Sequence, residues 1–212
     1  MIDYAQLNQF MYEGNAPKVQ EIIKKALADG MPVNEILSEG LIAGMAVLGE
    51  DFKHNILYVP EVLIAARAMK MGLNELKPYL GEGDDVQKRG VVVIGTVKGD
   101  LHDIGKNLVS MMAEGAGYEV HDLGVDISSD QFIEAAKEHK ADIVGMSALL
   151  TTTMPYMKTV VDDFKSNGLE NVKLVIGGAP INKAFAEEIG ADGFGPDAAS
   201  SVEVFHQLMD AS

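Results

Sequence analysis

From Gly90 onward, short runs of β-branched and small apolar residues alternate with segments of helical periodicity, and few folds accommodate that alternation. The runs are "GVVVIG", "YEVHDLG", "ADIVGMSA", "VKLVIGG" and "ADGFG". Strands that are apolar on both faces are typical of a parallel sheet covered by helices on both sides. Right-handed crossovers between five such strands produce a doubly wound, flavodoxin-like (Rossmann-like) sheet. The sequence therefore predicts an α/β domain over residues 90–212, with a five-stranded parallel sheet of order 2-1-3-4-5.

Residues 1–80 show helical periodicity instead, broken at glycine and proline residues. A second helix is expected to begin at Asn15, because asparagine caps helices and a proline fits the first turn. A third is expected to span about residues 34–52, and Pro60 opens a fourth. Four helices with short connections predict an all-α four-helix bundle in front of the sheet. The glycine-rich, charged residues 81–89 are interpreted as a linker.

Composition excludes several classes of partner and site. The formal net charge of −15 opposes binding to nucleic acid or to an anionic membrane surface. The chain has no cysteine, which rules out disulfides, thiolate metal sites and cysteine-ligated iron–sulfur clusters. No apolar stretch reaches the roughly 18 residues of a membrane span, and the first residues lack a basic and apolar leader. We expect a cytoplasmic protein without nucleic-acid or membrane partners.

Three loops of the expected sheet share one edge. Ligands of doubly wound sheets bind beyond the carboxyl ends of the strands, where the strand order reverses. The loop after the first strand, Thr96–Gly105, carries an imidazole and carboxylates. The loop after the third, Ser147–Thr153, carries hydroxyls, and Gly177–Pro180 after the fourth offers bare backbone. The sequence predicts a binding site at this edge.

His102 lies two residues after Asp100 and one before Asp103. A lone loop histidine is most often a solvated or hydrogen-bonded side chain, and an aspartate after a strand often caps the next helix. The Asp-x-His spacing also lets a carboxylate accept from one imidazole nitrogen while the other nitrogen binds a metal. A single histidine does not hold zinc by itself, but one axial nitrogen suffices when a macrocycle supplies the other ligands.

The other loops also admit ordinary interpretations. The run "SALLTTT" before Pro155 is typical of a hydroxyl-rich helix start, and Gly177–Gly178 is typical of a simple turn. Gly195–Ser200, "GPDAAS", suits a helix capped by Asp197. The spacing in "GTVKG" differs from the Gly-x-Gly-x-x-Gly of dinucleotide-binding loops. Each loop alone is therefore weak evidence for a binding site, and only the three loops together, in this order, form a specific pattern.

Together, "DLHDIG" (Asp100–Gly105), "SAL" (Ser147–Leu149) and the pair Gly177–Gly178 match the Asp-x-His-x-x-Gly, Ser-x-Leu and Gly-Gly signature of corrinoid-binding proteins. The stretch Phe52–Leu80 resembles the end of the helical cap that precedes this domain in cobalamin-dependent methionine synthase. The corrinoid proteins of methanogenic and acetogenic methyltransferase systems have the same cap. The resemblance covers almost the whole chain and implies cobalamin as cofactor.

The resemblance also implies roles for individual residues. In this family the lower nucleotide of cobalamin detaches from cobalt, and His102 would replace it as the lower axial ligand, the base-off/His-on state. Asp100 would orient the imidazole, and Thr153 stands where methionine synthase has the serine of the same relay. His102, Asp100 and Thr153 are thus the expected catalytic set. A proton taken up by the Asp100–His102 pair would favour the detached Co(I) state, and its loss the ligated methylcobalamin state.

The same resemblance implies further contacts with the cofactor. Ser147 would donate to the buried nucleotide base, Leu149 would line its slot, and Thr151 would add a polar contact. A β-carbon on the glycine pair would collide with the ligand. The complete expected binding set is Asp100, His102, Asp103, Ile104, Gly105, Ser147, Leu149, Thr151, Thr153, Gly177, Gly178, Ala179, Phe52 and Val59.

For three residues of the helical segment and one of the site loop, more than one role is compatible with the sequence. Phe52 and Val59 match positions over the upper cobalt face, with plain core packing as the alternative. His54 follows Phe52 closely, and a solvated surface histidine is the preferred interpretation. For Asp103 the preferred interpretation is a helix cap.

By resemblance, the chain is a methyl carrier that is not catalytic alone, the corrinoid subunit of a methyltransferase system. A donor-specific methyltransferase would load the methyl group, a second would deliver it to tetrahydrofolate or a similar acceptor, and a reductive activase would restore Co(I). Carriers of this build serve methylamines, betaine, methanol and aryl methyl ethers. One alternative is a cobalamin-binding sensor or regulatory module, which would bind DNA. The other is the small subunit of an adenosylcobalamin-dependent mutase, against which the helical cap argues.

Overall fold

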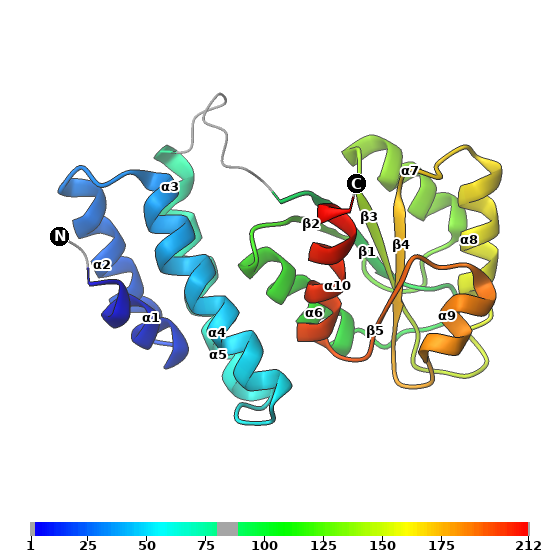
Figure 1. The fold of residues 1–212 in the computed structure, drawn as a ribbon, viewed down its shortest axis with the longest axis horizontal. Helices are drawn as coiled ribbons and strands as arrows, with labels where there is room; N and C mark the ends of the chain where they lie inside the picture. Colours follow the sequence, from blue (N-terminus) through cyan, green and yellow to red (C-terminus); the bar gives the residue numbers. More distant parts are fainter. Residues whose placement is uncertain (1–2, 80–88, 212) are drawn as a thin grey trace. The chain divides into compact units, whose positions relative to one another are not determined.

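The computed structural model describes residues 3–79 and 89–211 (Figure 1). The chain divides into a helical unit, formed mainly by residues before Arg89, and an α/β unit formed by those after it. The predicted linker, 81–89, lies outside the described residues except for Arg89. Among the described residues, none of the helices is both long and apolar enough to span a membrane.

The helical unit contains the four helical stretches that the sequence predicts. The third stretch runs without interruption from Val33 to Lys53, and its middle part is π-helical. Asn15 caps the second helix, since its side chain accepts the Lys18 N–H. The elements are α1 (Tyr4–Tyr12), α2 (Ala16–Ala28), α3 (Val33–Glu35), η1 (Ile36–Ile42), α4 (Ala43–Lys53), α5 (Val59–Leu76) and the 3₁₀ turn η2 (Lys77–Tyr79).

The helical unit is held together by a shared apolar interior. Leu7 of α1, Ile23 of α2 and Leu48 of α4 are fully buried. Helices α2 and α5 pack closely because Gly72 carries no side chain: a β-carbon there would lie 2.9 Å from Ile23 Cδ1. Burial of such side chains supplies the main driving force for a bundle of this size.

The α/β unit is built on a five-stranded parallel sheet of order β2-β1-β3-β4-β5, which confirms the predicted topology. In its register Thr96 of β1 pairs with Ser147 of β3, and Ser147 pairs with Gly177 of β4. The carboxyl ends of these three strands therefore stop at the same level. The strands are β1 (Val91–Thr96), β2 (Glu119–Asp122), β3 (Ile143–Ser147), β4 (Lys173–Gly177) and β5 (Gly193–Gly195).

Helices cover both faces of this sheet (Figure 1). Helices α6 (Ile104–Gly115) and α10 (Ala198–Asp210) lie on one face. Helices α7 (Ser129–His139), α8 (Tyr156–Ser166) and α9 (Lys183–Ile189) lie on the other, where they enclose one continuous apolar core. This double cover explains why the strands are apolar on both sides.

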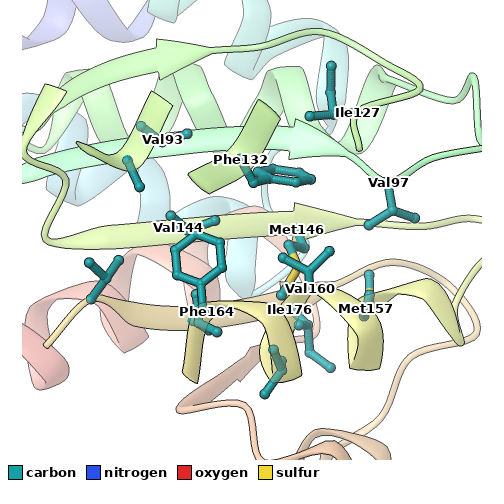
Figure 2. Close-up of a cluster of buried hydrophobic side chains, with 14 of the residues drawn as sticks. Val93, Val97, Ile127, Phe132, Val144, Met146, Met157, Val160, Phe164 and Ile176 are labelled. Carbon is teal, nitrogen blue, oxygen red and sulfur yellow. The ribbon is translucent and has the colours of Figure 1, made fainter. Parts of the chain in front are cut away.

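The core anchors the end of β1, from which the first site loop departs. Figure 2 shows Phe132 of α7 over this strand, between Val93 and Val97. A β-carbon on Gly95 would lie 2.9 Å from the Phe132 ring, so glycine in β1 makes room for the aromatic side chain. Val97 is fully buried and forms an isolated parallel bridge with Ile127. The loop that follows thus starts from a fixed point.

Candidate functional site

The buried carboxylate of Asp100 lies at the centre of the carboxyl edge. Its Oδ1 accepts the backbone N–H of His102 at 3.1 Å and lies 2.7 Å from His102 Nδ1. Its Oδ2 accepts the backbone N–H of Leu149 at 2.8 Å, that of Leu150 at 3.2 Å and the Thr153 hydroxyl at 2.6 Å. One fully buried side chain thereby joins the loop after β1 to the loop after β3.

The Asp-x-His spacing has a local physical reason. An aspartate side chain readily accepts the backbone N–H two residues ahead, which folds the chain into an Asx turn. In that turn the side chain of residue 102 lies beside the same carboxylate, so Asp100 Oδ1 binds both the N–H and the ring of His102. The imidazole is therefore oriented by contacts within the three residues from Asp100 to His102.

The charge of Asp100 settles which imidazole nitrogen carries the proton. Burial raises the pKa of this carboxyl, but hydrogen bonds from Thr153, His102 and the Leu149 N–H outweigh it and hold the pKa well below its usual range. An ionised carboxylate has no proton to donate, so His102 Nδ1 must donate to it. In the neutral ring this leaves the Nε2 lone pair free, on a side chain that is 50% exposed.

Two further residues, both missed by the sequence analysis, hold the loop that carries His102. The fully buried Thr96 donates its hydroxyl to the His102 carbonyl at 2.8 Å. Asp126, in the loop after β2, accepts the Gly99 N–H at 2.7 Å and donates its own N–H to the Asp100 carbonyl at 3.1 Å. The rule that placed the other loops at this edge applies equally to the loop after β2, and that signal was available in the sequence.

Exposed apolar side chains flank the imidazole on both loops. Leu101 is 71% exposed and Ile104 76%, and both are close neighbours of His102 in the chain. Leu149 is 44% exposed and Leu150 40%, next to the backbone that binds Asp100. Such side chains gain free energy when a ligand with an apolar face covers them. The edge therefore offers one unpaired nitrogen within an apolar surface.

This chemistry fits a metal that brings most of its own ligands. In the described residues, no group of three or more His, Asp or Glu side chains could hold a metal ion. One imidazole nitrogen completes the coordination of a metal inside a planar macrocycle, whose apolar parts can rest on leucine and isoleucine side chains. The residues present at this edge thus fit a corrinoid.

The remaining predicted residues occupy the same edge. Ser147 ends β3, and its carbonyl accepts the Val97 N–H at 3.0 Å. Asp103 directly precedes α6, and its carbonyl accepts the Asn107 N–H at 2.8 Å, which is the N-cap position. Thr151 and Ala179 are exposed in their loops. Whether these residues contact a cofactor stays a prediction.

The glycines of the site have different structural reasons. Gly178 has φ +129°, and a β-carbon there would overlap the Ala148 carbonyl oxygen. A β-carbon on Gly177 would lie 3.0 Å from the Gly195 carbonyl oxygen. A β-carbon on Gly105 would meet no atom within 4 Å. The protein's own packing therefore requires glycine at 178, independently of the collision with a ligand that the sequence analysis expected, whereas Gly105 faces open space.

Lys106 is a buried cation that the sequence analysis did not single out. Its ammonium group lies 2.6 Å from Asp122 Oδ1 and 2.6 Å from Asn107 Oδ1, with 1% of its side chain exposed. Asp122 ends β2, so the pair joins the first turn of α6 to that strand. Lysine in an amphipathic helix is usually solvated, and the ion pair with Asp122 of the following strand explains the burial of Lys106.

The predicted residues of the helical unit lie around its α4–α5 turn. Phe52 near the end of α4 and Val59 at the start of α5 are half-buried, and Ile56 between them is 63% exposed. His54 is exposed, and its Nδ1 lies 2.9 Å from the Glu50 carbonyl oxygen. The expected place of Phe52 and Val59 over the upper face of cobalt stays a prediction.

Replacing Gly178 with alanine is expected to destabilise the protein by about 2–4 kcal/mol, because it adds left-handed strain to an overlap with the Ala148 carbonyl. Gly168→Ala is the matched control. Gly168 has φ +69°, and no atom lies within 4 Å of its missing β-carbon. It should therefore cost only about 1 kcal/mol. Urea unfolding of both variants measures the difference, and equal losses would contradict this explanation of Gly178.

Asp100→Asn should lower the free energy of unfolding by about 1–3 kcal/mol at neutral pH, since the amide disrupts the donors around the carboxylate. The native-state pKa of Asp100 is depressed, so its stabilising effect is complete above the unfolded-state value near 4 and declines as pH falls below it. The stability difference between wild type and variant should therefore be constant above about pH 5 and shrink as the pH falls from there towards about pH 2. Urea titrations of the cobalamin-free protein measure it, and a pH-independent difference would contradict the depressed pKa.

Comparison with protein families identifies domains over most of the chain. Residues 90–203 and residues 4–77 match two family models, each described as a B12 binding domain. The dimethylamine corrinoid protein 1 of Methanosarcina acetivorans is 46% identical over 188 residues, which is 88% of each chain. The dimethylamine corrinoid protein of Methanosarcina barkeri is 44% identical over 90% of each chain.

Solved structures show the same likeness. A chain of the methanol:cobalamin methyltransferase complex from Methanosarcina barkeri superposes with a TM-score of 0.87 at 28% identity, over 97% of this chain and 79% of that one. A cobalamin-binding protein from Desulfitobacterium hafniense superposes with a TM-score of 0.81 at 33% identity, over 98% and 99%. The predicted combination of a helical domain and a Rossmann-like domain is confirmed.

Proposed function

The chain belongs to the B12-binding corrinoid proteins, and we propose that it carries a methyl group on the cobalt of a bound cobalamin between two methyltransferases. In this proposal the cofactor binds base-off with His102 as the lower axial ligand. The observation that carries it is the Asp100–His102 contact of 2.7 Å, which commits Nδ1 to the carboxylate. The remaining nitrogen, Nε2, is the atom proposed to bind cobalt.

A bound corrinoid supplies a cobalt centre that accepts and releases a methyl group. The protein's part is to fix the imidazole and to manage one proton. His102 would hold the metal through Nε2, with the ring neutral and its proton on Nδ1. If Nε2 were free and protonated instead, the adjacent Asp100 carboxylate would stabilise the positive charge of the ring. The Thr153 hydroxyl donates to the far oxygen of that carboxylate and keeps it ionised.

The loops after β3 and β4 are proposed to receive the cofactor's nucleotide tail. Ser147 ends its strand level with Thr96 and Gly177, so the three loops begin side by side. Ser147, Leu149 and Thr151 would contact the tail. Gly105 would let it pass close to α6, because a side chain there would extend into open space that nothing in the protein fills.

Partners follow from the same proposal. Several relatives are named dimethylamine corrinoid proteins, and one structural neighbour comes from a methyltransferase complex. These names support a donor methyltransferase that acts on a methylated amine. We further propose an acceptor methyltransferase that uses tetrahydrofolate or a similar acceptor, and a reductive activase that restores Co(I).

The axial assignment is tested by absorption spectra after reconstitution with cobalamin. Wild type should show the spectrum of histidine-ligated, base-off cobalamin, and His102→Ala should lack it, because the variant has no imidazole at the edge. His139→Ala is the control, since His139 ends α7 in the same unit and takes no part in the Asp100 contacts. The same spectrum in all three proteins would refute His102 as the ligand.

The same preparations test the methyl-carrier function. Wild-type protein loaded with reduced cobalamin should be methylated by a dimethylamine methyltransferase supplied with dimethylamine, and the loss of that methyl group should depend on a second methyltransferase. A loaded protein that is never methylated by any amine methyltransferase, yet binds a specific DNA, would instead support the sensor alternative.

A further inference from the structure

We infer that Asp126 is a positioning residue for His102, because it clamps the backbone on which Asp100 and His102 are carried. This inference rests on the proposed function, in which His102 Nε2 meets the cofactor. It adds a residue from a loop outside the Asp-x-His-x-x-Gly, Ser-x-Leu and Gly-Gly signature.

The clamp consists of two reciprocal hydrogen bonds. Asp126 Oδ1 accepts the Gly99 N–H at 2.7 Å, and the Asp126 N–H donates to the Asp100 carbonyl at 3.1 Å. The first bond holds the N–H of the Lys98–Gly99 peptide and the second holds the carbonyl of the Asp100–Leu101 peptide, so the peptide groups on both sides of the Gly99–Asp100 bond are restrained. An ionised side chain makes the first of them a charge-assisted bond.

Both partners have positive φ, which is uncommon for aspartate and readily adopted by glycine. Asp126 has φ +60° and Gly99 has φ +84°. Aspartate is among the few residues that adopt left-handed backbone with modest strain, and its short side chain then reaches a neighbouring backbone N–H. Strain of this kind persists only where surrounding contacts fix it. Here the contacts that fix it lead to the loop of the candidate site.

The loop that carries Asp126 is itself anchored to the end of β1. Thr96 donates its N–H to the Gly124 carbonyl at 3.0 Å, and its carbonyl accepts the Ile127 N–H at 2.9 Å. Asp126 therefore lies between two residues, Gly124 and Ile127, that are hydrogen-bonded to Thr96. Its side chain is exposed, but its backbone is restrained on both sides. These hydrogen bonds on either side allow the exposed Asp126 to restrain the Gly99–Asp100 backbone.

The two loops around Asp100 bind different parts of this residue. The loop after β3 binds the Asp100 carboxylate through Leu149, Leu150 and Thr153. The loop after β2 binds the Asp100 main chain through Asp126. Fixing both the carbonyl and the carboxylate of one residue fixes the direction of its side chain, and with it the plane of the His102 ring.

The test uses variants that separate the acceptor oxygen from the left-handed backbone. Asp126→Asn keeps both an acceptor oxygen and tolerance of positive φ, whereas Asp126→Gly keeps only the backbone conformation. Asp192→Ala is the control, since Asp192 accepts the Leu174 N–H at 2.8 Å at the amino end of the sheet. It removes a bond of the same kind far from the site.

Two readouts are combined for each variant. In the cobalamin-free chain, amide hydrogen exchange of Gly99 should be at least about tenfold faster in Asp126→Gly than in wild type, and nearly unchanged in Asp126→Asn. After loading with cobalamin, the fraction with a histidine-ligated spectrum should fall in Asp126→Gly and return in Asp126→Asn. Asp192→Ala should lower the melting temperature without changing either readout at the site.

The outcomes distinguish this inference from the proposed function. If Asp126→Gly keeps both the slow exchange and the wild-type spectrum, Asp126 does not position the loop. If Asp192→Ala reduces histidine ligation as much as Asp126→Gly does, the effect is one of global stability and the inference is overturned. If wild type itself shows no histidine ligation, the proposed function fails, and the exchange of Gly99 alone still decides whether Asp126 clamps the loop.

Discussion

The site depends on a single buried carboxylate that receives five hydrogen bonds. Burying Asp100 would be costly in isolation, but donors from two loops surround it and keep it ionised. Because it is ionised, it dictates that His102 donates from Nδ1 and leaves Nε2 unprotonated when the ring is neutral. A choice of tautomer, and so the capacity to bind a metal, follows from the protonation of a different residue. In the proposed function, the binding of a corrinoid by His102 depends on this contact.

The rest of the α/β unit serves to bring those two loops together. The register of the sheet ends β1, β3 and β4 at the same level, and the apolar core holds Val97, the residue that follows the first strand. Thr96 then donates a hydrogen bond to the His102 carbonyl. The Lys106–Asp122 ion pair ties the start of α6 to the end of β2. These contacts come from separate elements and converge on one loop, which gives the imidazole a defined direction before any cofactor is bound.

Much of this could be predicted, because the deciding signals are local. Runs of apolar residues predicted the strands, and the doubly wound fold class gave their order. The Asp-x-His spacing pointed to an oriented imidazole, since an Asx turn needs only adjacent residues. Lys106 escaped prediction for the opposite reason, because its partner Asp122 becomes a neighbour only through the fold. For Asp126 the topology indicated the loop, but the contact with Gly99 also depends on the fold. The π-helical middle of the third helical stretch also left no sign in the apolar periodicity. At Gly178, sequence could indicate glycine but not that a carbonyl of the protein itself excludes a side chain.

The central claim is that Asp100 fixes the His102 tautomer, and nitrogen NMR of the cobalamin-free protein tests it most directly. In uniformly ¹⁵N-labelled protein at a pH where His102 is neutral, two-bond ¹H–¹⁵N correlations report which ring nitrogen carries the proton. The contact with Asp100 predicts a protonated Nδ1 and a bare Nε2. Asp100→Asn should weaken that preference, because an amide can also donate to the ring. A wild-type spectrum with the proton on Nε2 would contradict the claim, since that nitrogen would then have no lone pair with which to bind cobalt.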